Sequence, residues 1–122
     1  PKAAAAILGV RPEWTWSKLR VLVDAEGKAH FRYARESATH KFRGASRNEP
    51  PFGLVVLGQM AVRGKWTPPP HGTAKHDNAI RAMNRLGNLL RALVPISGEP
   101  FETREGDIHP VFQVRLKDRY NE

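Results

Sequence analysis

The chain has 122 residues, of which 40% are hydrophobic and 26% charged, a balance typical of one soluble globular domain. It contains no cysteine and no apolar run near the ~20 residues of a membrane-spanning helix, so we expect no disulfide, no thiolate metal site and no membrane partner. Twenty Lys and Arg residues oppose twelve Asp and Glu residues, which gives a net charge of +8. This excess predicts a polyanionic partner, and nucleic acid fits it better than an anionic membrane surface.

Residues 18–35 predict a β-hairpin, with 1–17 as an N-terminal extension of a domain at 18–122. Apolar positions alternate on both sides of a turn that Gly27 can close. One alternating set of positions contains Leu19, Val21, Val23, Ala29, Phe31 and Tyr33, and the other contains Arg20, Leu22, Asp24, His30, Arg32 and Ala34. Trp14 and Trp16 precede the hairpin on one face of an extended segment, and we expect them to cover the core rather than to stack on bases.

The polar segment 36–51 ends in two prolines and predicts a loop. Residues 28–47 form the most basic stretch of the chain, with Glu36 as their only acid. Their cations are Lys28, Arg32, Arg35, Lys41, Arg43 and Arg47. Phe31, Tyr33 and Phe42 are interleaved with them, so the stretch is a candidate for binding single-stranded nucleic acid or RNA by phosphate contacts and base stacking. A solvated strand face explains the same residues equally well.

Two helices are predicted. Residues 51–63 are apolar on nearly every side, with Pro51 in the first turn and Gly64 beyond the end, although a buried strand through Val55 and Val56 remains an alternative. Three prolines at 68–70 then predict an extended linker. The second helix is expected to begin near Thr73 or Asp77 and to end before Pro95.

The second helix separates its residues cleanly at ~100° per residue. Its apolar arc contains Ile80, Ala82, Met83, Leu86, Leu89, Leu90, Leu93 and Val94, and its polar arc contains Arg81, Asn84, Arg85, Asn88 and Arg91. No acid occurs between Asp77 and Glu99, and asparagine is a poor helix former. Arginine forks suit guanine edges or phosphates, and asparagine pairs with adenine, so this composition favours a nucleic-acid contact over an ordinary solvated face.

Residues 98–116 contain two β-like runs around Gly106 and predict a second hairpin, in which Pro110 marks an edge or an early end. Phe112, Val114 and Leu116 lie on one side of its second strand, and Val111, Gln113 and Arg115 lie on the other. The stretch "AIRAMNRLGNLLRALVPISGEPFETREGDIHPVFQVRL", after a hairpin and an apolar helix, resembles the winged helix-turn-helix, in particular the OmpR-type effector domains of response regulators. The family has a regular helix where this chain has "WTPPPHGTAKHDN".

The resemblance implies an α+β winged-helix domain with two or three helices and a C-terminal hairpin as the wing. It implies that Arg81, Asn84, Arg85 and Asn88 face the major groove, with Arg91 nearer the DNA backbone. It makes Arg104 the wing residue. Lys75 completes the set of DNA-binding candidates.

The first functional hypothesis is therefore binding of double-stranded DNA, by a transcription regulator or by the DNA-binding part of a replication or mobile-element protein. The alternatives are single-strand or RNA binding through residues 28–47, and a protein-protein assembly module, with a homodimer or larger assembly left open. Each would be intracellular, in the cytoplasm if the source is bacterial.

An enzyme is not expected. His71, His76 and Asp77 are the nearest approach to a metal or hydrolytic site, but their spacing lacks the i, i+4 pattern of helical metal ligands. The serines have no nucleophile-elbow motif, and the glycines lack the spacing of a phosphate-binding loop. We therefore expect no cofactor and no bound metal.

Overall fold

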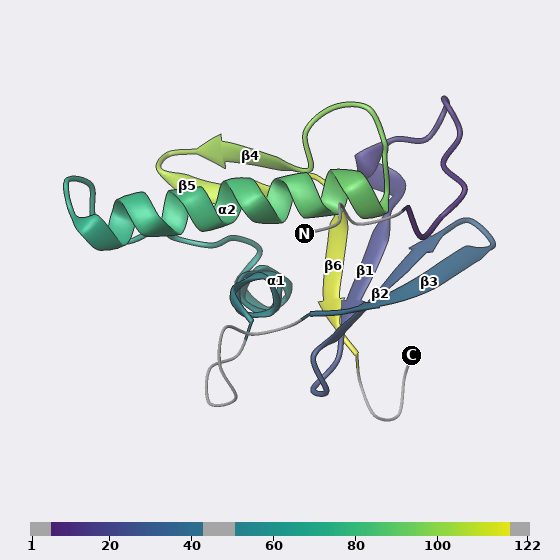
Figure 1. Ribbon diagram of the computed structural model, residues 1–122, viewed down its shortest axis with the longest axis horizontal. Coiled ribbons are helices and arrows are strands. Elements are labelled where there is room, and N and C mark those ends of the chain that lie inside the picture. The colour runs from purple at the N-terminus through teal and green to yellow at the C-terminus, as the bar shows by residue number, and fades with distance from the viewer. Residues whose placement is uncertain (1–5, 43–50, 118–122) are drawn as a thin grey trace.

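The computed structural model describes residues 6–42 and 51–117 and shows an α+β fold, in which two helices accompany a four-stranded mixed sheet and a separate hairpin (Figure 1). The large sheet has the strand order β3-β2-β1-β6, and β6 is the one strand parallel to its neighbour. Its strands are β1 (Arg20–Val23), β2 (Lys28–Tyr33), β3 (Glu36–Lys41) and β6 (Gln113–Leu116). The other elements are a 3-10 turn (Trp16–Lys18), α1 (Phe52–Arg63), α2 (Ala74–Leu93), β4 (Phe101–Arg104) and β5 (Asp107–Pro110).

The first hairpin is confirmed, because β1 and β2 pair antiparallel around the turn at Asp24–Gly27. The Asp24 carboxylate accepts hydrogen bonds from the backbone N–H groups of Glu26 and Lys28, both at 2.9 Å. Gly27 has φ +89°, a conformation that side chains disfavour. One of the two alternating sets is buried in the core and consists of Leu19, Val21, Val23, Ala29, Phe31 and Tyr33.

The loop prediction for residues 36–51 is wrong over its first part, where β3 pairs antiparallel with β2. Ser37, Thr39 and Lys41 alternate with half-buried Glu36, Ala38 and His40, so the segment shows no apolar alternation that the sequence could reveal. An edge strand made of polar residues is hidden from a reading based on hydrophobic periodicity.

The two tryptophans before β1 are buried, as predicted. The Trp14 ring stacks on the Tyr33 ring at a centroid distance of 3.9 Å, and the Tyr33 hydroxyl accepts a hydrogen bond from the Thr15 N–H. The Trp16 indole N–H donates to the Gly98 carbonyl. Leu8, Trp14 and Trp16 belong to the same core cluster as the sheet, so the boundary placed between residues 17 and 18 does not separate two packing units.

Both helices are confirmed. Helix α1 follows Pro51 and ends at Gly64, which has φ +79°, so the alternative of a buried strand through Val55 is wrong. Helix α2 begins at Thr73, whose side chain accepts a hydrogen bond from the His76 N–H, and its C-cap is Val94, immediately before Pro95. Helix α1 packs against β1, β6 and α2.

The second hairpin is shorter than predicted. Strands β4 and β5 pair only as far as Pro110, and the next residues leave the hairpin to form β6, parallel to β1. Of the side predicted to be apolar, Phe112 is buried but Leu116 is 53% exposed. Pro110 lacks the N–H group that a longer β4–β5 ladder would need. The following strand β6 pairs instead with the edge of β1 that β2 leaves open. The sheet therefore joins residues from both ends of the sequence.

Candidate nucleic-acid interface

The polar arc of α2 is exposed at Arg81, Asn84, Arg85 and Asn88, whereas Met83, Leu86, Leu90 and Leu93 on its opposite side are buried. The predicted division of this helix is confirmed. Lys75 is exposed in the first turn, but at ~100° per residue it points about 120° away from Arg81 and does not extend this arc.

Two members of the polar arc are engaged within the protein. One Arg91 nitrogen donates to the Glu99 carboxylate and the other to the Asn88 side-chain oxygen. The loop after α2 thus brings an acid back to the helix, although the helix sequence itself has none between Asp77 and Glu99. These contacts occupy the Asn88 side-chain oxygen and one N–H on each of two Arg91 nitrogens.

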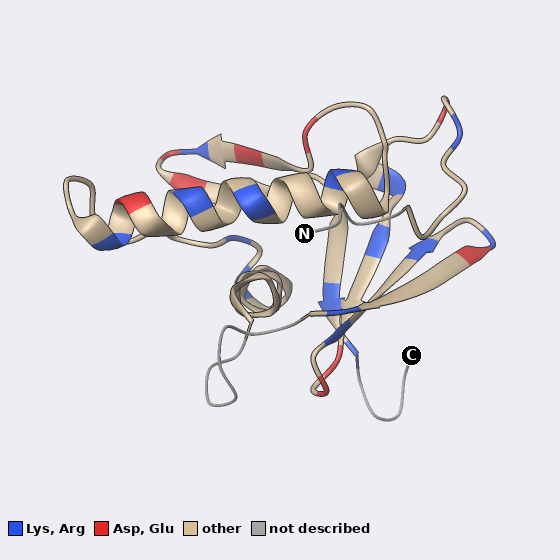
Figure 2. Ribbon diagram, viewed as in Figure 1, with Lys and Arg blue, Asp and Glu red and all other residues tan. Residues whose placement is uncertain are grey.

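The hairpin β4–β5, the predicted wing, carries more acid than base (Figure 2). Its one arginine, Arg104, lies with its Nε 3.1 Å from the Glu102 carboxylate. Asp107 accepts hydrogen bonds from Lys65 and Thr67, both at 2.8 Å, and these contacts lower the pKa of its carboxyl. Glu105 is exposed at the turn. This hairpin is poorly suited to lie against phosphates.

The large sheet turns its basic residues away from the core. In β1 and β2 the odd-numbered residues from Val21 to Val23 and from Ala29 to Tyr33 are buried, so the even-numbered residues point to the other face. Strand pairing places Arg20 opposite Arg32, Lys28 opposite Lys41 and Leu22 opposite Arg115. We call the resulting surface the basic sheet face; it contains Arg20, Lys28, Arg32, Lys41 and Arg115. Figure 2 shows Lys and Arg positions on the neighbouring strands β1, β2 and β6.

Two cross-strand pairs on this face combine like charges, Arg20 with Arg32 and Lys28 with Lys41. Like charges directly opposite each other destabilise a sheet, by an amount comparable to the ~0.2–1 kcal/mol that a favourable pair contributes. The fold does not require this arrangement, because uncharged β-formers would suit the same exposed positions better.

A cavity of about 360 Å³ opens on the basic sheet face. Its lining consists of Arg20, Val21, Leu22, Arg32, Gln113 and Arg115. Three strands, β1, β2 and β6, each supply one arginine, and no acid contributes to the lining. The Gln113 amide N–H₂ lies 3.4 Å from the Ser17 carbonyl at the rim.

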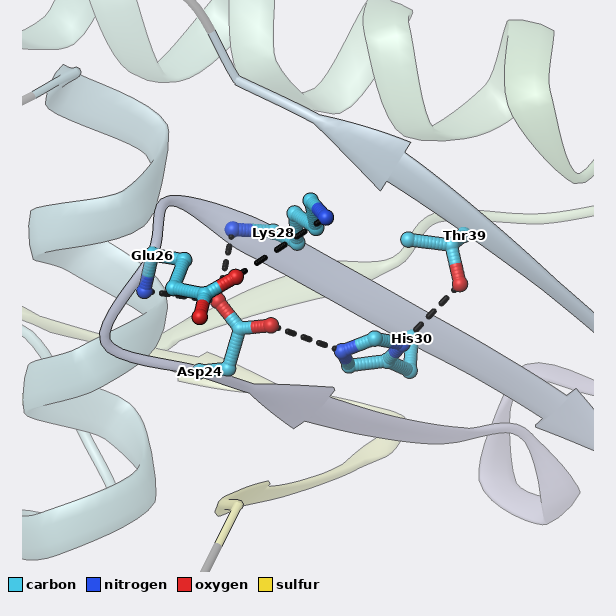
Figure 3. A network of polar contacts seen from close by, with 5 residues as sticks. All are labelled: Asp24, Glu26, Lys28, His30 and Thr39. Atoms are coloured by element: carbon cyan, nitrogen blue, oxygen red, sulfur yellow. Dashed lines mark hydrogen bonds and ion pairs between the residues drawn. The ribbon is translucent and has the colours of Figure 1, made fainter.

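A polar network at the turn between β1 and β2 contains Asp24, the residue that directly follows β1 (Figure 3). Asp24 lies 2.9 Å from one ring nitrogen of His30, whose other ring nitrogen lies 2.9 Å from the Thr39 hydroxyl. Burial raises the pKa of Asp24, but its hydrogen bonds with the Lys28 N–H, His30 and the Glu26 N–H outweigh this effect, and the net shift is downward. The contacts of Asp24 are thus with the backbone of its own turn and with His30, and none of them is with an arginine of the cavity.

The structure brings only part of the predicted basic stretch together. Lys28, Arg32 and Lys41 lie on the basic sheet face, whereas Arg35 is in the turn between β2 and β3. Arg43 and Arg47 lie outside the described residues. Phe31, Tyr33 and Phe42 are all buried, so the expectation that these rings stack on bases is wrong.

Sequence reasoning missed Arg20, Gln113 and Arg115. Their alternation with apolar neighbours signals outward-facing strand positions, but nothing in the sequence indicates that β6 pairs with β1. The two histidines considered for a metal or hydrolytic site lie next to each other. The His71 and His76 rings lie 4.1 Å apart, and a His76 ring nitrogen lies 2.9 Å from the Pro69 carbonyl.

The chain matches no protein-family model, no curated protein and no solved structure closely enough to indicate kinship. Within residues 6–42 and 51–117, neither helix combines the length and the apolar character needed to cross a bilayer. The two candidate binding surfaces of the described residues are therefore the basic sheet face and the polar arc of α2.

Proposed function

We propose that this protein binds double-stranded nucleic acid through its basic sheet face, with little dependence on base sequence. The observation that carries the proposal is the opposition of Arg20 and Arg32 across β1 and β2. Their mutual repulsion lowers the stability of the free protein and is relieved when a polyanion binds. The net charge of +8 supports the same class of partner.

A duplex suits this face better than a single strand. Proteins that bind single strands without sequence preference combine basic grooves with aromatic rings on which bases stack. The rings of β2 and of Phe42 point into the core. A face of cations without a stacking ring favours phosphate contacts, and duplex DNA presents one negative charge per ~1.7 Å of its axis.

The polar arc of α2 is a second candidate surface, because Arg81, Asn84 and Arg85 are exposed on one side of the helix. Under this alternative the fold is a winged helix with β4–β5 as its wing, and the helix reads bases as in a transcription regulator or the DNA-binding part of a replication or mobile-element protein. The acidic hairpin argues against this mode, since Glu102 and Glu105 would approach phosphates beside the groove.

Two matched double variants separate the surfaces. Arg20→Gln with Arg32→Gln and Arg81→Gln with Arg85→Gln each remove two positive charges. We expect the sheet pair to weaken duplex binding by at least about tenfold, and to reduce the slope of log K against log salt by about 1.8 if both residues contact phosphates. We expect the helix pair to have a smaller effect.

The opposite ranking would transfer the site to α2. A wild-type protein that binds no duplex at low salt would exclude both surfaces as duplex-binding sites and would leave single-strand binding and protein-protein assembly as the remaining alternatives.

A further inference from the structure

We propose that the cavity between Arg20, Arg32 and Arg115 is a seat for one phosphomonoester group, as found at the end of a nucleic-acid strand or on a free mononucleotide. This inference rests on the proposed function, since it assigns a particular ligand group to part of the basic sheet face. It adds a chemical preference to what would otherwise be a diffuse electrostatic surface.

The strand register brings the three arginines to one hollow. On one side of Arg20 lies Arg32 in β2, and on the other side lies Gln113 in β6. Arg115 follows two residues after Gln113 on the same face, opposite Leu22. All of these residues line the cavity. Three adjacent strands thus each contribute one arginine to the lining of a single cavity, and a guanidinium group can form a bidentate pair with phosphate oxygens.

The other lining residues suit the remainder of a nucleotide. Gln113 offers both a donor and an acceptor, which a sugar hydroxyl or an ester oxygen can use. Leu22 is half-buried in the lining and offers an apolar contact to a sugar ring. The volume of about 360 Å³ lies at the small end of the range for ligand sites, which is ~300–1,000 Å³.

Charge favours a monoester over a diester. A phosphomonoester carries about −1.5 to −2 charges at pH 7, whereas a diester carries one. A monoester also has a single ester substituent on its phosphorus atom, so its three other oxygens can enter a hollow first. A diester within a strand has two ester substituents, and both must extend out of the cavity. Three arginines without a lining acid are therefore matched more closely by a strand end.

The test compares two versions of one short blunt duplex, identical in sequence, with a 5′-phosphate or a 5′-hydroxyl at each end. We expect the phosphorylated duplex to bind about tenfold more tightly, the factor that one additional charge-assisted hydrogen bond provides. Arg115→Gln should abolish this preference while duplex binding itself persists. Arg35→Gln, the same charge change in the β2–β3 turn outside the cavity, should retain the preference.

Side-chain NMR of the arginine Nε–Hε groups during titration with adenosine monophosphate, and separately with inorganic phosphate, tests the seat without a duplex. Shifts confined to the cavity arginines support the seat. Such shifts with adenosine monophosphate, together with equal binding of the two duplexes, identify the free nucleotide as the preferred source. Equal binding of the two duplexes, with no arginine shifts, overturns the seat while the proposed function stands. Failure of all duplex binding, with the arginine shifts present, overturns the proposed function and leaves the seat.

Discussion

Arg20 in β1 and Arg32 in β2 lie directly opposite each other on the face of the sheet that is turned away from the core. Arg20 is exposed and Arg32 is half-buried, and their strands are held together by the buried pair Val21 and Phe31 on the other face. Because the core fixes the strands, the two charges cannot move apart by a change of register. The folded state thus keeps these two positions opposite each other.

Replacement of Arg32 by Thr should stabilise the free protein. Threonine is a good β-former and removes the like charge, so we expect a gain of about 0.2–1 kcal/mol in the free energy of unfolding at low salt. Urea unfolding at low and at high salt measures this gain, which should shrink at high salt because ions screen the repulsion. A loss of stability at low salt would show that Arg32 is structural.

Asp24 should contribute to stability in a pH-dependent way. Its pKa is lowered below 3.8 in the folded state, so its contribution is complete above that value and is lost as the pH falls through the lower folded pKa. Asp24→Asn should destabilise the protein at neutral pH by about 1–3 kcal/mol, because it disturbs the partly buried hydrogen bonds to the Lys28 N–H and to His30.

Unfolding free energies measured from neutral pH down past 3.8 check this prediction. The wild type should lose stability relative to Asp24→Asn on acidification, so the two curves should converge. Curves that remain parallel would mean that the carboxylate charge does not hold the turn and His30.

Glu99→Gln tests the surface on α2. The change weakens the tie on Arg91, which also bonds Asn88, and leaves a protein with one acid fewer near the polar arc. Glu99 is 75% exposed at its side chain, so stability should change by less than about 1 kcal/mol. Duplex affinity, measured by fluorescence anisotropy, should rise only slightly if the sheet face is the site. A large rise would indicate that α2 carries the contact.

Gly53→Ala should destabilise the junction of α1 with α2. A Cβ atom at residue 53 would lie 2.9 Å from both Leu86 and the Phe42 ring, so the packed side chains must shift, at a cost of about 1–3 kcal/mol. Gly58→Ala is the matched control in the same helix, because a Cβ there meets nothing within 4 Å. The control should gain about 0.5–1 kcal/mol from helix propensity. Thermal unfolding of both variants distinguishes them, and equal effects would contradict the close approach at Gly53.

The local elements were predictable where a period or a cap marks them. Alternation revealed β1 and β2, and Thr73, Pro51 and Gly64 marked helix ends. Strand β3 was missed because its outward residues and most of its inward ones are polar. Helical periodicity divided α2 correctly, but it could not show that Glu99 folds back onto Arg91.

Most of the candidate site could not be predicted from the sequence, because it depends on the pairing of two strands that are distant in the chain. Arg20 and Arg115 are far apart in sequence and meet only because β6 leaves the hairpin at Pro110 and pairs with β1. Parallel pairing of distant segments has no local signal, since each strand carries only its own alternation. The basic character of residues 28–41 was visible, and the cavity that completes it was not.

An NMR titration of the protein with a short DNA duplex locates the nucleic-acid contact without any substitution. A duplex-binding site on the basic sheet face predicts that backbone amide shifts concentrate in β1, β2 and β6 and that the arginine side chains of this face respond with them. Shifts concentrated in α2 and in the β4–β5 hairpin, with the sheet unchanged, would contradict it.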